Sequence, residues 1–307
     1  MQKEKGTGNL SIAAVERETG ISKDALRVWE RRYGFPLPTR NAFGERVYPA
    51  AQVGRLRMIR RLMDQGMRPG RIFALPPGEL QALAAGAPPV ARSALHDLAL
   101  YLVKTHQTAE LRREFEQAAV RDGLFRFVSE TAAPLAVLVG EAWMRGEIEV
   151  FEEHLFTEQM QGVLRQAIAQ VPTAGGAPKV LLSTLPGEQH GLGLLIAEAA
   201  CALEGAQCIS LGIQTPVSEI VAAARANAAD VVGLSFCGSY AAGAMREGVQ
   251  VLRRDLPTGT ALWCGGAGTA RMRNPPAGVL VLNDLAAIGG ALAEWRDQAR
   301  TAASLQA

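Results

Sequence analysis

The sequence predicts a multidomain fold in which two α-helical parts precede an α/β part. Its 307 residues are enough for about two or three domains. Stretches rich in Pro and Gly at 75–89 and 171–178 interrupt helices and indicate linkers. Apolar residues recur at helical spacing before the second stretch, whereas short apolar runs alternate with Ala-rich segments after it. These observations place three domains at 9–78, 88–172 and 178–300.

Charge is distributed unevenly along the chain, although the formal net charge is only +2. Residues 1–75 contain 15 Lys and Arg against 7 Asp and Glu, a net charge of +8, so the remainder carries −6. A basic segment on an otherwise acidic chain favours a polyanion as the partner of that segment.

Composition also bears on the cellular compartment. No apolar run reaches the roughly 20 residues that a membrane span needs, and the first six residues have no secretory-signal pattern. We therefore expect a cytoplasmic protein that does not contact a membrane. The four cysteines lack zinc-site spacing, so we expect reduced thiols at Cys201, Cys208, Cys237 and Cys264.

The first domain begins with two short helices. Residues 11–20 predict a helix that Gly20 ends, and Ser22 is placed to cap a second helix that runs through Trp29. Two helices joined by a short turn containing Gly form a helix-turn-helix. Pro and Gly residues within 34–48 suit a small hairpin, or wing. The second helix carries four cations suited to phosphates and base edges, Lys23, Arg27, Arg31 and Arg32.

The pattern Arg27-x-Trp29-Glu30-Arg31-Arg32-Tyr33-Gly34, followed by Arg40 and Gly44-x-Arg46-x-Tyr48, resembles the DNA-binding domain of the MerR family. The resemblance implies a winged helix-turn-helix that binds a double-stranded DNA operator as a dimer, with Arg46 and Tyr48 on the DNA backbone. The simpler interpretation makes Trp29 and Tyr33 core residues and the arginines a solvated face. We expect Trp29 to pack in the core and the cations to bind DNA. The candidate DNA contacts are Lys23, Arg27, Arg31, Arg40, Arg46 and Tyr48.

The second domain is expected to be helical throughout and suits a four-helix bundle. Trp143 is followed, after nine residues, by the pair Glu153-His154. Taken alone, these residues fit a core tryptophan and a solvated pair.

The third domain alternates expected strands with helices. Apolar runs begin at Val180, Gln207, Val231 and Thr260, and helices are expected at 191–204, 216–228 and 240–254. Buried strands that alternate with helices predict a Rossmann-like parallel sheet covered on both faces. No GxGxxG follows the first strand, which disfavours a dinucleotide site.

Polar and glycine residues follow three of these strands. Glu188-Gln-His190-Gly-Leu-Gly193 follows the first, Ser235 ends the third, and Gly265-Gly266 follows the fourth. A His at a strand end can project into the crevice beyond the carboxyl ends of the strands. This set resembles the cobalamin-binding Rossmann-like domain.

That resemblance implies a role for each residue of the set. His190 would bind cobalt as the lower axial ligand, and Ser235 would contact the dimethylbenzimidazole tail of the cofactor. Gly193, Gly265 and Gly266 would make room for that tail. Glu188 stands where the family more often has Asp, and either carboxylate can accept the imidazole N–H.

The order and lengths of all three domains resemble the light-sensing, adenosylcobalamin-dependent regulators of the CarH/LitR type. This resemblance implies that Trp143 covers the upper face of the cobalamin and that Glu153 and His154 contact its upper ligand. It further implies a homo-oligomer, dimer or tetramer, that occupies DNA with adenosylcobalamin in the dark and releases it in light.

One residue departs from that family. The family has a His directly after the tryptophan, whereas Met144 stands here, and a thioether cannot reproduce a strong imidazole ligand of cobalt. Three alternatives follow. His154, or less readily His96 or His106, could move in as the upper ligand. Water could stay above cobalt. Alternatively, the pocket at Met144 could hold a second chromophore, such as a bilin or another tetrapyrrole, beside or above the corrin.

We therefore predict a cobalamin-dependent, light-responsive repressor that is not an enzyme. One alternative is a regulator that senses cobalamin or another tetrapyrrole without light, which Met144 keeps open. The other is a corrinoid protein that carries methyl groups between partners. The basic helix-turn-helix argues against a carrier, because such a protein has no need of Arg27, Arg31 and Arg46.

Overall fold

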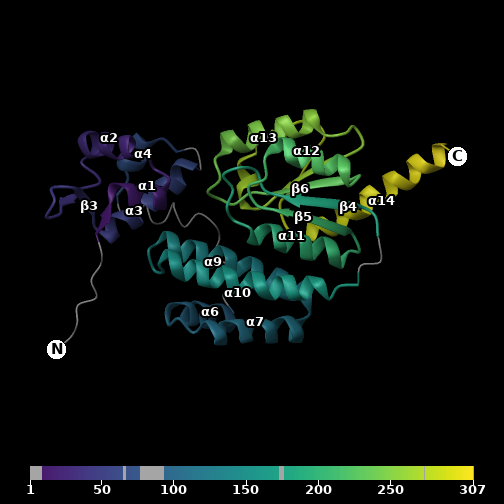
Figure 1. Ribbon diagram of the computed structural model, residues 1–307, viewed down its shortest axis with the longest axis horizontal. Helices are drawn as coiled ribbons and strands as arrows, with labels where there is room; N and C mark the ends of the chain where they lie inside the picture. The colour runs from purple at the N-terminus through teal and green to yellow at the C-terminus, as the bar shows by residue number, and fades with distance from the viewer. Residues whose placement is uncertain (1–8, 65–66, 77–92, 173–175, 273, 307) are drawn as a thin grey trace. The chain divides into compact units, whose positions relative to one another are not determined.

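The structure is a computed structural model that describes residues 9–64, 67–76, 93–172, 176–272 and 274–306 (Figure 1). The described residues fall into two compact units. One lies within Met1–Ala91 and Leu138–Glu153, and the other within Arg92–Val137 and His154–Ala307. Most of the expected linker at 75–89, and part of that at 171–178, lies outside the described residues.

The helix-turn-helix forms where its capping residues predict it. Helix α1 (Ile12–Thr19) begins at Ser11, whose side chain accepts a hydrogen bond from the Ala14 N–H. It ends at Gly20, which adopts a left-handed φ of 64° that suits glycine. Helix α2 (Lys23–Tyr33) begins in the same way at Ser22 and ends at Gly34. The predicted end of the first helix at Gly20 and the predicted start of the second at Ser22 are confirmed.

A three-stranded antiparallel sheet forms the wing. Strands β1 (Leu10–Ser11), β2 (Thr39–Arg40) and β3 (Arg46–Tyr48) pair in the order β1-β3-β2. At the tip, Asn41 Oδ1 accepts hydrogen bonds from the backbone N–H groups of Phe43 and Glu45. The Asn41 side chain therefore fixes the turn that connects β2 to β3.

Two further helices complete this core, α3 (Ala50–Asp64) and α4 (Pro69–Phe73). Trp29 is buried and packs edge-on against Phe73, with 5.2 Å between ring centroids. The expectation that Trp29 is a core residue is confirmed. The other large apolar residues of this core include Leu26, Leu56, Ile59, Leu62 and Ile72.

The middle part contains the four expected helical stretches. They are α6 (Ala94–Lys104), α7 (Thr108–Asp122), the run formed by α8 (Leu124–Arg126), the π-helix η1 (Phe127–Ala132) and α9 (Ala133–Met144), and α10 (Val150–Ala169). Phe115 contacts Phe127 and Phe156, with ring centroids 6.5 and 6.0 Å apart, so three of these stretches share one core. His96 is buried and caps α6: its Nδ1 accepts from the Ser93 N–H, and its Nε2 lies 3.0 Å from the Glu130 carbonyl oxygen.

The C-terminal part is a five-stranded parallel sheet in the order β5-β4-β6-β7-β8. Helices α11 and α14 cover one face, and α12 and α13 cover the other (Figure 1). The strands are β4 (Lys179–Ser183), β5 (Gln207–Gly212), β6 (Val231–Ser235), β7 (Ala261–Gly265) and β8 (Val279–Leu282). The helices are α11 (Leu192–Leu203), α12 (Val217–Ala226), α13 (Ala242–Asp255) and α14 (Ala286–Gln306).

Alternating side chains along the central strands supply both cores. Leu181 and Val232 face the core formed with α12 and α13, whereas Val180 and Val231 face the core formed with α11 and α14. The strand order reverses between β4 and β6, and ligands of open parallel sheets bind beyond the carboxyl ends at such a switch point. The loops that follow β4 and β6 therefore form the candidate site.

Candidate cofactor and DNA-binding sites

His190 lies in the loop between β4 and α11, and Glu188 holds it there. Glu188 Oε1 accepts a hydrogen bond from the His190 backbone N–H at 2.9 Å and lies 2.8 Å from His190 Nδ1. Its other oxygen, Oε2, accepts from the Cys237 backbone N–H at 2.8 Å. The Glu188 side chain is 1% exposed and that of His190 is 57% exposed. A buried carboxylate thus presents an exposed imidazole at the switch point of the sheet.

The same contacts set the charge of the pair. Burial opposes ionisation of Glu188, but the hydrogen bonds from His190 and Cys237 outweigh it and lower the pKa of Glu188. Hydrogen bonds with the Cys237 side chain and with Glu188 raise the pKa of His190 to about 10. Nδ1–H therefore donates to an ionised carboxylate, and Nε2 is the nitrogen that remains for a metal.

The loop after β6 contributes a residue that sequence reasoning missed. The donor atoms of Cys237, Glu188 and His190 all lie within 4.8 Å of one another. Cys237 Sγ also lies 3.0 Å from Ser239 Oγ. The available signal was its position two residues after Ser235, because the carboxyl ends of β4 and β6 meet at one edge of the sheet.

Two glycines of the site lie too close to other atoms of the chain to carry a side chain, whereas a third does not. A Cβ added to Gly193 would lie 2.6 Å from Ser235 Oγ, and one added to Gly266 would lie 2.4 Å from the Phe236 carbonyl oxygen. Those two glycines are required by the close approach of the chain to itself. At Gly265 the nearest atom, the Leu282 carbonyl oxygen, would be 3.7 Å away, which is ordinary contact.

The residues after β4, β6 and β7 meet at one edge. Ser235 pairs with Gly265 in the sheet, and the close approach of Gly193 to Ser235 joins the start of α11 to the end of β6. An exposed imidazole whose Nε2 can exchange its proton for a metal, with a buried carboxylate behind it, fits the lower face of a cobalamin. The sequence-predicted residues Glu188, His190, Gly193, Ser235, Gly265 and Gly266 are thus brought together.

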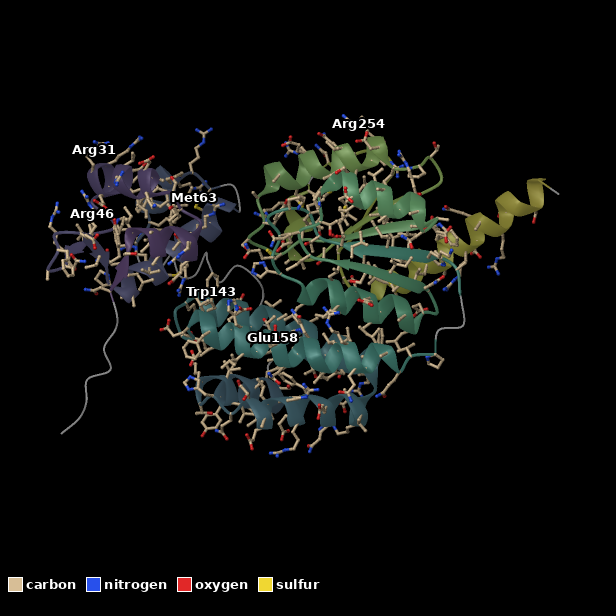
Figure 2. All side chains as sticks on the ribbon, in the orientation of Figure 1. Arg31, Arg46, Met63, Trp143, Glu158 and Arg254 are labelled. Atoms are coloured by element: carbon tan, nitrogen blue, oxygen red, sulfur yellow. The ribbon has the colours of Figure 1, made fainter. Side chains whose placement is uncertain are left out.

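The expected cap residues lie on α9 and α10. Trp143 is in the last turn of α9 (Figure 2), where the guanidinium carbon of Arg57 lies 5.0 Å from its ring centroid. Glu153 is half-buried and His154 exposed, both near the start of α10. Met144 ends α9, and its side chain lies outside the described part of the chain.

The candidate DNA contacts other than Tyr48 lie on the accessible face of α2 and on the wing. Arg31, Arg32 and Arg40 are exposed, and Figure 2 shows Arg31 and Arg46 at the surface. Two cations are partly neutralised by neighbours. Lys23 Nζ lies 3.4 Å from Glu16 Oε2, and Arg27 Nη1 lies 3.3 Å from Asp24 Oδ1.

Tyr48 takes a different place from the one expected of a DNA contact. Its side chain is buried, and its hydroxyl donates to Glu30 Oε1 at 2.7 Å. Arg46 Nε donates to the other oxygen of Glu30 at 3.2 Å. Burial is the larger cause and the hydrogen bond to Glu30 the second, and both raise the pKa of Tyr48. Tyr48 and Glu30 therefore tie β3 to α2, and only Arg46, whose side chain is 40% exposed, reaches the surface.

Comparison with known proteins identifies the types of domain that this chain contains. Residues 10–75 match the family model described as MerR HTH family regulatory protein. Residues 96–168 and 178–280 each match a model described as B12 binding domain. The chain is 30% identical to the HTH-type transcriptional repressor CarH of Myxococcus xanthus, over 85% of this chain and 89% of that protein.

The chain belongs to the CarH family of MerR-type, cobalamin-binding regulators. Another relative, the repressor CarA of Myxococcus xanthus, is 29% identical over 74% of this chain and 76% of its own length. The monomethylamine corrinoid protein of Methanosarcina barkeri has the same fold over 64% of this chain and 96% of its own, with a TM-score of 0.53 and 13% identity. As a CarH-family member, this chain binds DNA and cobalamin and is not an enzyme, which removes the methyl-carrier alternative.

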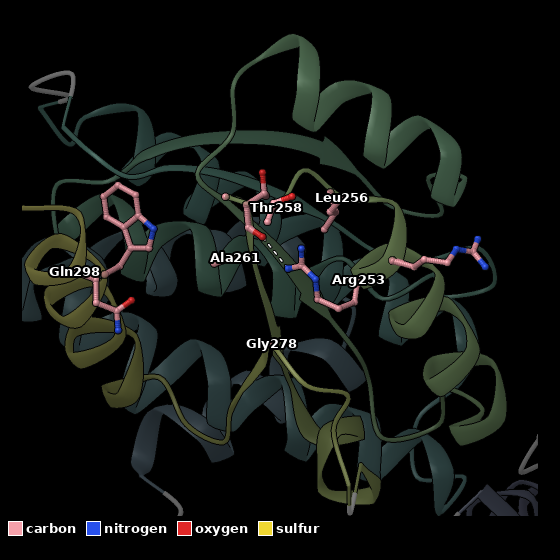
Figure 3. A pocket seen from close by; sticks show the side chains of 10 residues that line it. Arg253, Leu256, Thr258, Ala261, Gly278 and Gln298 are labelled. Carbon is pink, nitrogen blue, oxygen red and sulfur yellow. Dashed lines mark hydrogen bonds between the residues drawn. The ribbon is translucent and has the colours of Figure 1, made fainter. Parts of the chain in front are cut away.

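A second hollow of this CarH-family chain lies near the opposite edge of the sheet. It is a cavity of about 560 Å³ beside Ala261, at the start of β7, and Trp295 of α14 (Figure 3). Arg253 lines it, but its guanidinium already donates to the carbonyl oxygens of Thr260 and Pro257. Arg253 therefore closes the turn before β7, and its donors are engaged within the fold. Among the described residues, no helix combines the length and apolar character needed to cross a bilayer.

Proposed function

We propose that this CarH-family chain is a repressor whose hold on operator DNA is controlled by adenosylcobalamin and light. The observation that carries the proposal is the Glu188–His190 pair, a buried ionised carboxylate that presents an exposed imidazole at the sheet switch point. In the same chain, a basic helix-turn-helix exposes Arg31 and Arg40. Sensing and DNA binding are thereby assigned to different domains.

The lower part of the site would hold the cofactor through the chain's own polar groups. His190 Nε2 would coordinate cobalt, while Glu188 keeps the Nδ1 proton and fixes the orientation of the ring. Ser235 would contact the tail, and Gly265, which has no side chain, would leave room for it. A bound adenosylcobalamin supplies a cobalt–carbon bond that light cleaves.

The upper part of the site falls to residues of α9 and α10. Trp143 would cover the upper face, and Glu153 and His154 would contact the upper ligand. Since Met144 replaces the imidazole of the light-sensing relatives, His154 is the exposed imidazole best able to replace it after illumination. His96 is a poor substitute because both of its ring nitrogens lie against backbone partners in the cap of α6.

Control of DNA follows from linkage between cofactor and assembly. A cofactor that binds one oligomeric state more tightly shifts the population towards that state. We propose that adenosylcobalamin favours an oligomer, dimer or tetramer, in which several basic helix-turn-helix domains hold one operator. The names of two relatives, both repressors, support repression as the effect of DNA binding.

Absorbance spectra test the cofactor part of the proposal. Full-length protein is loaded with adenosylcobalamin in the dark, freed of unbound cofactor and then illuminated. We expect a bound spectrum with imidazole below cobalt in the dark, and a different stable spectrum after light. His190→Ala should abolish the imidazole-bound spectrum, whereas Gln189→Ala, at an exposed neighbour, should not. A dark spectrum that light leaves unchanged would contradict light control.

A gel-shift assay tests the DNA part. Duplexes selected by this protein from a random-sequence library are bound with and without adenosylcobalamin, in the dark and in light. Tight binding that requires cofactor and darkness supports the proposal. Binding that responds to cofactor but is indifferent to light supports the second candidate, a light-independent cobalamin or tetrapyrrole sensor, which Met144 favours. Failure to select any duplex contradicts both.

A further inference from the structure

Arg57 of α3 connects the helix-turn-helix to the segment that carries Trp143. Its Nη2 lies 2.6 Å from Glu18 Oε2 on α1, and its side chain is 8% exposed. Its Nη1 donates to the Trp143 carbonyl oxygen at 3.4 Å, and its guanidinium carbon lies 5.0 Å from the Trp143 ring centroid. One buried cation thus joins α1, α3 and the end of α9, which all belong to the same compact unit.

Gly54 contributes to the same contact from one turn earlier on α3. It is buried, and the nearest atom to a Cβ built on it, apart from its own helix and chain neighbours, is the Arg145 carbonyl oxygen at 4.0 Å. The missing side chain lets the end of α9 approach α3. Gly54 and Arg57 therefore form one small docking surface for residues 143–145.

The indole of Trp143 is only partly satisfied in this contact. Its Nε1 is buried and finds no hydrogen-bond partner among the described residues. A buried donor without a partner costs free energy that another arrangement can recover. Part of the ring surface is also covered by Arg57, so a flat ligand that packs on Trp143 must share or displace this contact.

We propose that Arg57 is a coupling residue, which holds Trp143 in the ligand-free chain and competes with cofactor binding there. The inference rests on the proposed role of Trp143 in covering cobalamin. When the cofactor packs on the indole, the contact between Arg57 and Trp143 breaks. The helix-turn-helix is then no longer tied to α9 and can reorient on DNA. Competition of this kind lowers the apparent affinity for cofactor, and removing the contact restores it.

Two variants on α3 disrupt the contact in different ways. Arg57→Lys keeps a cation beside Glu18 but loses the planar group that stacks on the indole and reaches the carbonyl. Gly54→Leu leaves Arg57 and Glu18 in place and pushes Arg145 away. Arg60→Lys is the matched control, because Arg60 also lies on α3 and donates to the Gly20 carbonyl oxygen within the helix-turn-helix.

The first measurement needs no cofactor. Hydroxyl-radical footprinting with mass spectrometry reports the oxidation of Trp143 in the ligand-free, full-length protein. We expect Trp143 oxidation to rise in Arg57→Lys and in Gly54→Leu and to stay at the wild-type level in Arg60→Lys. Equal oxidation in all four proteins would refute the contact, whatever cobalamin does.

The second measurement is the dissociation constant for adenosylcobalamin in the dark, from absorbance titration. Loss of a partly buried cation–π contact should tighten binding by about 3- to 30-fold in Arg57→Lys and Gly54→Leu, with no change in Arg60→Lys. The factor by which cofactor changes the affinity for selected duplex DNA should also decrease in both variants, and by reciprocity duplex DNA should change the cofactor affinity of each variant by that same decreased factor. Unchanged or weaker cofactor binding in both variants would overturn the competition. A wild-type chain that binds no cobalamin would instead contradict the proposed function, and the footprint still decides the contact.

Discussion

At the scale of single residues, the site depends on a buried carboxylate, which orients an exposed imidazole. Glu188 uses both oxygens, one for His190 and one for the backbone of Cys237. The sequence motif predicted the Glu188–His190 pair, because the spacing of two residues brings the side chains together locally. It did not predict Cys237, whose contact depends on the pairing of β4 with β6 across about 50 residues of chain.

Cobalt ligation by His190 should depend on pH in a defined direction. The pKa of the imidazolium is raised from 6.5 to about 10, and cobalt must displace the Nε2 proton. The imidazole-bound fraction at fixed cobalamin should therefore rise as pH increases from 6.5 towards 10 and level off above it. Spectral titration at several pH values measures this fraction.

Glu188→Gln provides the comparison for that titration. Without the carboxylate charge the pKa of His190 falls, so the rise with pH should shift to lower values while cofactor binding weakens. A wild-type profile that is flat from pH 6.5 to 10 would contradict the protonated state assigned to His190.

Substitutions of Tyr48 and Arg40 should affect two different properties, the stability of the helix-turn-helix and its binding to DNA. Tyr48→Phe removes the hydroxyl that donates to Glu30, which should lower the free energy of unfolding of the helix-turn-helix by about 1–3 kcal/mol. Arg40→Ala, at an exposed position on β2, should weaken DNA binding and leave stability nearly unchanged. Denaturant unfolding and gel shifts measure the two quantities. Lost DNA binding at unchanged stability in Tyr48→Phe would show that the hydroxyl itself contacts DNA.

At the scale of elements, the sequence predicted helix ends that depend on contacts within a few residues of the chain. Gly20 ends α1 and Ser22 caps α2 as predicted, because each acts on backbone groups within four residues. Strand β8 was not predicted, since its four residues follow a Pro- and Gly-containing segment and gain their order by pairing with β7. The hydrogen bond of Tyr48 to Glu30 was not predicted either, because the two residues are 18 positions apart in the sequence and only the fold brings them together.

The junction of β6 with α11 can be tested by two glycine substitutions. Gly193→Ala places a Cβ 2.6 Å from Ser235 Oγ and should destabilise the α/β domain by about 1–3 kcal/mol through overpacking. Ser235→Ala in the same chain removes that oxygen and should recover most of the loss. Gly265→Ala should leave stability nearly unchanged, because its Cβ makes only an ordinary contact with the Leu282 carbonyl oxygen, and it should weaken cobalamin binding by narrowing the proposed tail site. Thermal unfolding and cofactor titration distinguish these outcomes, and additive effects of Gly193→Ala and Ser235→Ala would contradict the assigned clash.

At the scale of the whole molecule, the opposite charges of the chain coincide with a division of labour. The basic segment forms the helix-turn-helix with its exposed arginines, whereas the acidic remainder contains the bundle and the cobalamin-binding sheet. Composition predicted this division, and the motifs assigned it. Neither composition nor motifs predicted the contact of Arg57 with Trp143, because it joins residues 86 positions apart that only the fold brings together.

DNA binding by the whole molecule should depend steeply on salt. Each phosphate contact that a cation makes releases counterions, so the logarithm of the affinity falls linearly with the logarithm of salt concentration. Arg31→Ala should weaken binding to all duplexes alike and reduce that slope by about one if Arg31 contacts a phosphate. Arg254→Ala, at an exposed residue of α13 in the other unit, should leave the slope unchanged. Equal slopes in wild type and Arg31→Ala would remove Arg31 from the phosphate contacts.

The buried bonds of Glu188 also have a kinetic consequence. The loop between β4 and α11 already holds His190 in its oriented state before any cofactor arrives, so its ordering entropy is lost during folding and not during binding. Cobalamin would then meet an imidazole that is already in place, and the loop would need no ordering at the moment of binding. We therefore expect the association rate for cobalamin to be set by steps other than the ordering of this loop.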